Sequence, residues 1–304
     1  MLTAWKSKYA FEVIMSFNSS SSPLINIIVA GVVRDCAKTL ERDFNNLSAI
    51  IGSKNVFFIL IESDSKDRTV EILEKLSKSN KNIIYESLGT LEYNIPSRLE
   101  RLAYCRNMYL DKIHNDTFAN FEYVLVADFD GVNKKFTKKS LHSCWDRTNW
   151  SVCTANQAGP YYDIFALRKD KWVDKDCFLN YQELITQGRS HSYAFYKSIV
   201  SKMFKSRDSE WIQVESAFGG VAIYRKKELL SSTYSAFDEY GRKQCEHVSL
   251  NRKIVKLGGK IFINPKMINS GITSNAIRAV IKFCLLLIYG EKYYRIFKKE
   301  IYPS

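Results

Sequence analysis

The sequence predicts an α/β fold built on an open sheet whose first strands run parallel. Apolar, β-branched runs recur through the first half of the chain, and segments with apolar residues at helical spacing separate them. Continuous apolar runs are typical of strands buried on both faces, as in parallel sheets. Strands that alternate with helices indicate a sheet covered by helices.

The predicted elements follow one another in a regular order through the first half. The strands are predicted at residues 25–33 (INIIVAGVV), 56–61 (VFFILI), 83–86 and 123–127 (YVLVA). Apolar residues recur every three or four positions in the segments between them. These segments give predicted helices at residues 37–51, 69–78 and 97–112. The second half is less regular, with strand-like runs at 217–224 and 260–263 and a helical stretch at 246–257.

Composition and charge limit the class of protein. The chain has 304 residues, 46% of them hydrophobic, which suits one large domain or two ordinary ones and is too apolar for a disordered chain. Lys and Arg number 45 against 32 Asp and Glu, a formal net charge of +13. This excess predicts an anionic partner: nucleic acid, a phosphorylated small molecule or a membrane surface. The seven cysteines include no CxxC spacing, which favours a reducing compartment.

Two carboxylates follow the strand at residues 123–127. Asp128 and Asp130 are alternate residues of an extended segment, so their side chains point to one side. Ligands of open α/β sheets bind at the carboxyl ends of the strands, and Mg²⁺ and Mn²⁺ prefer oxygen ligands. We therefore predict a metal site here. The alternative is a solvated acid that caps a turn, helped by Gly131.

Other polar groups also fall at positions where a ligand could bind. Glu62 and Asp64 follow the second strand and could accept hydrogen bonds from a ribose or base, whereas Ser65 and Asp67 there could instead cap the next helix. Arginines at positions 98 and 101 share a helix face and could contact a diphosphate, or could lie on a solvated face.

Two further groups come later in the chain. Glu246 and His247 are adjacent and offer a base and a metal ligand, although such a pair on a helix is often structural. Asn156 and Asp163 lie in the segment TANQAGPYYDIFALR, whose amides and aromatic rings suit a sugar. The alternative for this segment is a turn at Gly159-Pro160 between core tyrosines.

Several of these blocks, in this order, resemble a known class of enzyme. INIIVAGVVRD, ILIESDSKDRTVEIL, ERLAYCRN and YVLVADFDG are similar to the nucleotide-sugar-binding half of a GT-A glycosyltransferase, with Asp128-Phe129-Asp130 as its DxD motif. FGGVAIYRKKEL and CEHVSLNRKIVKLGGKIFINP resemble the acceptor half. ESDSKDRT, LAYCRN, YYDIFALR and CEHVSLN look most like the fungal capsule mannosyltransferase group and related bacterial polysaccharide enzymes.

The resemblance implies a GT-A type open mixed sheet over residues 24–266, with a Rossmann-like nucleotide-binding half at 24–133 and an acceptor half at 134–266. It implies a metal-dependent enzyme that uses Mn²⁺ or Mg²⁺. Such an enzyme moves a hexose, with mannose favoured, from a nucleotide-diphosphate sugar to a hydroxyl of a glycan or lipid-linked acceptor. The product class is surface polysaccharide, such as capsule or lipopolysaccharide.

The resemblance also implies roles for individual residues. Those expected to bind the donor are Val33, Asp35, Glu62, Asp64, Arg98, Arg106, Asp128, Asn156 and Asp163. Asp130 is expected to bind the metal, with Asp128 and His247 as further ligands. Glu246 and Asp128 are the expected catalytic residues, with Glu246 in the place of the acceptor-activating base. Inverting relatives keep two acids in that block, so the Glu-His pair here leaves a retaining reaction open.

The two ends of the chain are predicted to lie outside this domain. Residues 1–23 are expected to form an N-terminal extension, and residues 267–304 a basic amphipathic helical tail. The apolar run FCLLLIY in the tail is too short to span a bilayer, which takes about 20 residues. The tail is expected to bind an anionic membrane surface, or alternatively to pack on its own core. The expected location is cytoplasmic, peripherally bound to the inner face of the membrane.

Two other functions are weighed against the glycosyltransferase. A nucleotidyltransferase would need a glycine-rich loop after the first strand, and AGVVRDCAKTL has a single glycine. A nucleic-acid-binding protein would explain the charge, and lysines at 134, 135, 138 and 139 cluster after the DxD motif. No recognised nucleic-acid motif accompanies them, so no nucleic-acid partner is expected.

Overall fold

A computed structural model describes residues 26–204 and 210–301, so the predicted extension at residues 1–23 lies outside it. One eight-stranded open sheet forms the centre, in the order β3-β2-β1-β4-β7-β5-β8-β6. Its strands are β1 (Ile27–Val33), β2 (Val56–Glu62), β3 (Ile83–Ser87), β4 (Tyr123–Ala127), β5 (Val152–Gln157), β6 (Ile212–Val214), β7 (Val221–Arg225) and β8 (Ile261–Ser270). Strands β1 to β4 pair in parallel, whereas β7 pairs antiparallel with β4 and β5. The predicted open mixed sheet is confirmed.

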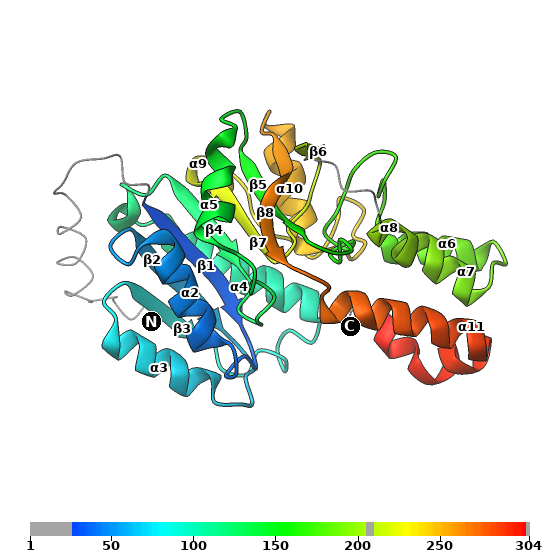
Figure 1. The fold of residues 1–304 in the computed structure, drawn as a ribbon. Helices are drawn as coiled ribbons and strands as arrows, with labels where there is room; N and C mark the ends of the chain where they lie inside the picture. Colours follow the sequence, from blue (N-terminus) through cyan, green and yellow to red (C-terminus); the bar gives the residue numbers. More distant parts are fainter. Residues whose placement is uncertain (1–25, 205–209, 302–304) are drawn as a thin grey trace.

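Helices cover both faces of the sheet (Figure 1). The longer helices are α2 (Leu40–Ile51), α3 (Thr69–Ser79), α4 (Arg98–Ile113), α6 (Cys177–Thr186), α10 (Glu246–Lys256) and α11 (Ser274–Ile301). The shorter ones are α5 (Lys138–His142), α7 (His191–Phe195), α8 (Ser201–Met203) and α9 (Lys226–Leu230). Two 3₁₀ turns, η2 (Asp116–Phe118) and η3 (Ser143–Asp146), and a π-helical turn, η4 (Tyr196–Val200), complete the described elements.

Alternate residues of β1 divide the core into two layers, as expected for a strand buried on both faces. Ile27 and Val29 pack with apolar residues of α2 and α3. Ile28 and Ala30 pack on the opposite face with residues of α4 and α10. A third, smaller cluster joins α6, α7 and α11, which lie together at one end of the molecule, away from β1 to β3 (Figure 1).

Two predicted boundaries in the second half differ from the structure. The strand predicted at residues 217–224 begins only at Val221, because Gly219 and Gly220 before it have left-handed φ angles of 75° and 89°. Strand β8 runs on to Ser270, so the predicted division between residues 266 and 267 falls inside a strand. Residues 267–270 therefore belong to the sheet, and the C-terminal helix begins at Ser274.

Candidate active site

A cavity of about 430 Å³ opens where the parallel strands end. It is lined by the loops after β1, β2 and β4, the first half of α4, and the start of α10. The predicted site residues that line it are Val33, Asp35, Asp64, Arg98, Arg106, Asp128, Asp130, Asp163, Glu246 and His247. Residues from both halves of the chain thus meet in one hollow, at the edge of the sheet where α/β folds bind ligands.

The DxD segment is held in place by its middle residue. Phe129 is buried against β1, where a Cβ on Gly31 would lie 2.6 Å from the Phe129 ring. The Phe129 carbonyl accepts a hydrogen bond from Thr39 Oγ1 at 2.6 Å. Next to it, the Gly131 N–H donates to Asp43 Oδ2 at 2.8 Å, and Gly131 has the left-handed φ of 83°. With the phenylalanine fixed inward, Asp128 and Asp130 on either side face the cavity.

The two carboxylates of this segment make an anionic pair. Asp130 is exposed and accepts one local hydrogen bond, from the Val132 N–H at 3.0 Å. Asp128 is recessed, and its burial together with the charge of Asp130 raises its pKa to about 8. Two carboxylates that oppose each other's ionisation are stabilised by a shared cation. This donor chemistry fits Mn²⁺ or Mg²⁺.

Protein ligands alone do not complete a metal site. Within the described ranges, no three His, Cys, Asp or Glu side chains are grouped closely enough to hold an ion. The hard cations that suit carboxylates usually keep waters and bind phosphate oxygens as further ligands. A site with two carboxylates therefore fits an ion that arrives with a diphosphate.

Arg106 joins the strand-end acids to the second half of the chain. Its guanidinium is buried, with Nε 2.9 Å from Glu246 Oε1 and Nη2 3.8 Å from Asp128 Oδ1. The rings of Phe218 and Tyr234 lie 5.5 and 5.6 Å from it. Arg106 was expected near the diphosphate or the donor sugar. It does line the cavity, but its measured contacts make it the counter-ion between two carboxylates.

His247 is the least satisfied polar side chain of the site. It is 2% exposed and stacks on Phe218, with ring centroids 3.9 Å apart. Neither ring nitrogen has a hydrogen-bond partner among the described residues, although Nε2 lies 3.8 Å from Glu246 Oε1. Burial, followed by the Arg106 charge, lowers the pKa of His247 well below its usual range. The imidazole is therefore neutral and has a lone pair for a metal or a hydrogen-bond donor.

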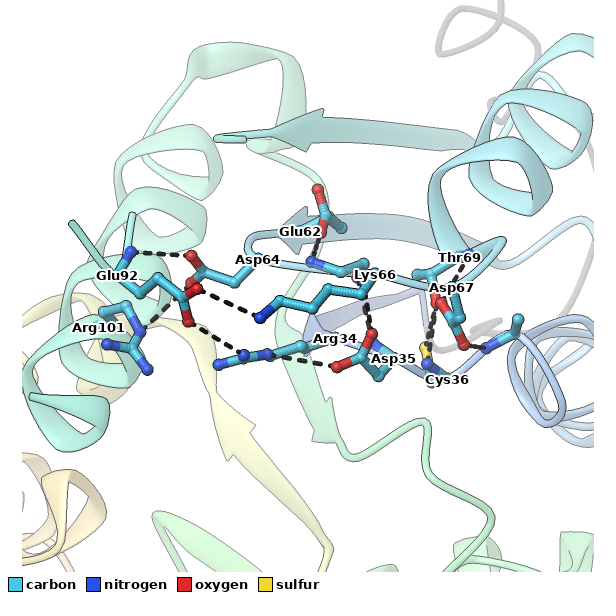
Figure 2. A network of polar contacts seen from close by, with 12 residues as sticks. Arg34, Asp35, Cys36, Glu62, Asp64, Lys66, Asp67, Thr69, Glu92 and Arg101 are labelled. Carbon is cyan, nitrogen blue, oxygen red and sulfur yellow. Dashed lines mark hydrogen bonds and ion pairs between the residues drawn. The ribbon is translucent and has the colours of Figure 1, made fainter. Parts of the chain in front are cut away.

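The acids after β1 and β2 are held differently, by partners within the protein (Figure 2). Asp35 Oδ1 accepts the Lys66 N–H at 2.7 Å, and Arg34 lies within 3.5 Å of both Asp35 and Glu92. Asp64 Oδ1 accepts the Glu92 N–H at 2.8 Å, and Oδ2 lies 3.3 Å from Arg101 Nε. Both aspartates line the cavity, but most of their polar atoms are already engaged.

Two of the predicted donor residues lie away from the cavity lining. Glu62 is 1% exposed, accepts the Ser65 N–H at 2.9 Å and is hydrogen-bonded to Ser87, so it fixes the loop after β2. Asn156 lies where the register of β5 against β8 shifts, and its Oδ1 accepts the N–H of the next residue. Asp163 does line the cavity, and its Oδ2 accepts the Gly219 N–H at 2.8 Å.

Arg101, Tyr162 and Phe218 also line the cavity. The sequence offered Arg101 for a diphosphate and Tyr162 for a sugar, but it gave Phe218 no role of its own. Its spacing from Arg98 drew attention to Arg101. The ion pair of Arg101 with Asp64 could not be predicted, because Arg101 lies on α4 and Asp64 follows β2. Phe218 precedes the glycine pair at 219 and 220. Its ring stacks on the His247 ring and lies 5.5 Å from the Arg106 guanidinium. No local pattern marks such an aromatic platform.

Comparison with known proteins agrees with this geometry. Residues 26–250 match the family model described as Cryptococcal mannosyltransferase 1. The fold and its strand-end cavity define a GT-A glycosyltransferase. The chain belongs to the Cryptococcal mannosyltransferase 1 family, which confirms the predicted resemblance and the assignment as a glycosyltransferase. A search of curated proteins finds no match.

Solved structures of other proteins are similar to the chain at low sequence identity. The mannosyltransferase PcManGT from Pyrobaculum calidifontis, in complex with GDP-Man and Mn²⁺, is 10% identical with a TM-score of 0.51, over 95% of this chain and 70% of that one. S. aureus TarS with UDP-GlcNAc is 12% identical with a TM-score of 0.46, over 88% and 67%. Glucosyl-3-phosphoglycerate synthase from Mycobacterium tuberculosis with UDP is 12% identical with a TM-score of 0.40, over 94% and 85%.

Proposed function

We propose that this chain transfers a hexose, with mannose favoured, from a nucleotide-diphosphate sugar to a hydroxyl of a glycan or lipid-linked glycan in surface polysaccharide synthesis. The observation that carries the proposal is the single cavity in which the strand-end aspartates meet Glu246 and His247. The family match supports mannose as the sugar. PcManGT, which shares the fold, was solved with GDP-Man, and this makes GDP-mannose the first donor to test.

The metal would be held by Asp130 and Asp128, with waters and phosphate oxygens as the further ligands. The neutral His247, predicted as a third ligand, lines the same cavity but is not grouped with the two aspartates closely enough to complete a three-ligand site in this structure. A bound Mn²⁺ or Mg²⁺ supplies charge neutralisation for the leaving diphosphate. The donor nucleotide would lie along Val33, Asp35 and Asp64, at the ends of β1 and β2. Arg98, which is exposed at the first turn of α4, is the cation available to the diphosphate.

Glu246 is the residue that we assign to accept the proton of the attacking hydroxyl. It is the first residue of α10, where the helix N-terminus favours a negative side chain. Arg106 Nε holds its Oε1 at 2.9 Å, while Oε2, which accepts a weak hydrogen bond from the Cys245 thiol at 3.8 Å, is the oxygen that we assign to the acceptor. General-base catalysis of this kind contributes about 10²–10⁴-fold to a rate. Arg106 acts as a positioning residue, because its one guanidinium contacts both Glu246 and Asp128.

Nucleotide release tests this function directly. The full chain is incubated with GDP-mannose, other common nucleotide sugars and a panel of glycan acceptors, with Mn²⁺, with Mg²⁺ or with EDTA. We expect metal-dependent release of the nucleoside diphosphate that rises with acceptor concentration. Release that EDTA leaves unchanged contradicts the metal role, and absence of release from every donor contradicts the function.

We also propose that the C-terminal helix binds an anionic membrane and holds the enzyme at the cytoplasmic face. Helix α11 is kinked at Gly290, and Leu286 before the kink and Tyr293 after it pack against α6 and α7. On another face, Ile277, Ile281 and Ile288 are 50%, 51% and 69% exposed, at spacings that align them along the helix. Arg278 is exposed next to Ile277, the first residue of this exposed stripe in the sequence, and Lys292 and Arg295 are exposed beyond the kink of α11 at Gly290. Among the helices of the described ranges, none has the length and hydropathy to cross a bilayer.

Substitution on the exposed stripe tests the membrane proposal without disturbing the packed face. Ile281→Gln with Ile288→Gln in the full chain is expected to reduce pelleting with vesicles of phosphatidylcholine and phosphatidylglycerol. The matched control is Leu257→Gln, since Leu257 is 65% exposed and lies outside α11. Equal pelleting of all three proteins would contradict a role for this face.

A further inference from the structure

A second hollow, of about 490 Å³, adjoins the active-site cavity. Its walls are the first residues of α6, the first turn of α4 and the segment that precedes α10. We propose that this groove binds the acceptor, as an uncharged oligosaccharide whose terminal sugar reaches Glu246. The inference rests on the proposed glycosyl transfer and adds to it the place and the chemical class of the acceptor.

The groove is continuous with the active site. Leu99 and Phe165 line both hollows, so the two share one wall. Gln244 lines the groove, and two residues further along the chain Glu246 lines the active-site cavity. A chain of sugars in the groove is therefore led past the residue that we assign as the base.

The groove has the surface that binds sugar rings. Phe165 and Phe178 are both half-buried, with ring centroids 5.2 Å apart in an edge-to-face arrangement. Half-buried aromatic rings offer an apolar face to the C–H side of a sugar. Exposed Gln182 on α6 adds an amide that can donate and accept hydrogen bonds. A few polar groups on a largely apolar wall are typical of a small-molecule site.

The charged side chains of the groove bear on whether the acceptor is a neutral or an acidic glycan. Five cations line it, but four of them are already paired with carboxylates. The pairs are Arg168 with Asp176 at 2.7 Å, Arg242 with Asp238 at 2.8 Å, Lys175 with Glu183, and Arg252 with Glu215 at 3.9 Å. The fifth, Lys243, contacts the Ser97 hydroxyl at 3.2 Å and is the one of the five for which the described residues provide no carboxylate partner. A phosphate or carboxylate that bound to any of the other four would compete with an existing pair, whereas sugar hydroxyls can bond to the pairs as they stand. This arrangement favours an uncharged glycan.

A glycan array tests the groove with defined probes. The full chain, with Mn²⁺ and each common nucleoside diphosphate in turn, is applied to neutral and to acidic oligosaccharides. We expect binding to neutral glycans, and an affinity about tenfold lower for Phe178→Ala, the factor expected for the loss of one stacked ring. Gln182→Ala, at an exposed position, should weaken the same glycans without changing the melting temperature. Phe204→Ala is the matched control, because Phe204 is 58% exposed and lines neither hollow.

The outcomes separate this inference from the proposed function. The proposal that the groove binds a neutral acceptor would be overturned if the Phe178 and Gln182 variants bound glycans as tightly as the wild type. Binding to acidic glycans alone would overturn it too. If the wild type releases nucleotide from a donor but binds no neutral glycan, the groove is wrong while the transferase function stands. If neutral glycans bind through Phe178 but no donor is turned over, the groove stands and the transferase function fails.

Discussion

Acidic residues lie at the ends of both β2 and β4, but the two groups of acids differ in the partners that the protein gives them. After β2, Glu62 and Asp64 accept backbone N–H groups and, for Asp64, lie beside Arg101. After β4, the charge of Asp130 adds to burial in raising the pKa of Asp128, and the buried His247, which lines the same cavity, has no hydrogen-bond partner among the described residues. The first group is held by protein partners, although Asp64 Oδ2 has the ion pair with Arg101 and no hydrogen bond among the described residues. In the second group Asp128 lies 3.8 Å from Arg106, and neither nitrogen of His247 has a hydrogen bond within the described part of the chain.

This difference indicates which acids maintain the fold and which await a ligand. Buried polar groups in native proteins are nearly always paired, and the exceptions ask for an explanation. We propose that a bound metal ion with its diphosphate would compensate Asp128 and Asp130, and that the same donor would give His247 a polar partner. Substitutions in the first group should therefore affect stability, and those in the second should affect turnover.

The largest effect is expected at Arg106, which connects the β4 acids to Glu246. Arg106→Met leaves both carboxylates without their buried counter-ion and should lower the free energy of unfolding by about 3–5 kcal/mol, measured by urea denaturation. Adding Glu246→Gln should recover part of this loss, because it removes one of the uncompensated charges. If the double variant were less stable than Arg106→Met, the result would contradict a stabilising ion pair between Arg106 and Glu246, whose atoms lie 2.9 Å apart.

The next effect is expected at Asp130, and on turnover alone. Asp130→Asn keeps an oxygen to accept the Val132 N–H but removes the charge. Nucleotide release should fall on the order of 10²–10³-fold, as when a group that stabilises developing charge is lost. The melting temperature should not change, because Asp130 is exposed. The matched control is Asp111→Asn at an exposed position of α4. If the two variants were equally active, the assignment of Asp130 to the active site would be wrong.

The smallest of the three effects is expected at Glu62, and on stability alone. Glu62→Ala leaves the Ser65 N–H and the Ser87 hydroxyl without their acceptor, so unfolding should become easier by about 1–3 kcal/mol. The KM for the donor should stay as in the wild type, because Glu62 does not line the cavity. Glu41→Ala, on the exposed side of α2, is the control. A raised KM with unchanged stability would instead make Glu62 a donor ligand.

The sequence allowed the strands and the acids at the strand ends to be predicted, because each depends on local pattern, whereas the mixed sheet was predicted from the family resemblance. It could not tell satisfied acids from unsatisfied ones, since their partners are distant in the chain. Arg106 and Glu246 are 140 residues apart, and Glu62 and Ser87 are 25 apart. Asn156 was misplaced for a related reason. The register shift between β5 and β8 decides where its side chain lies, and hydrophobic pattern carries no sign of such a shift.

Metal uptake tests the comparison between the two groups of acids most directly. The electron paramagnetic resonance signal of free Mn²⁺ is titrated with wild type, Asp130→Asn and Glu62→Ala, with and without GDP. The account predicts that wild type and Glu62→Ala take up one equivalent of Mn²⁺ in the presence of GDP, and that Asp130→Asn takes up none at the same concentrations. Equal uptake by Asp130→Asn, or loss of uptake in Glu62→Ala with its fold intact, would contradict the account.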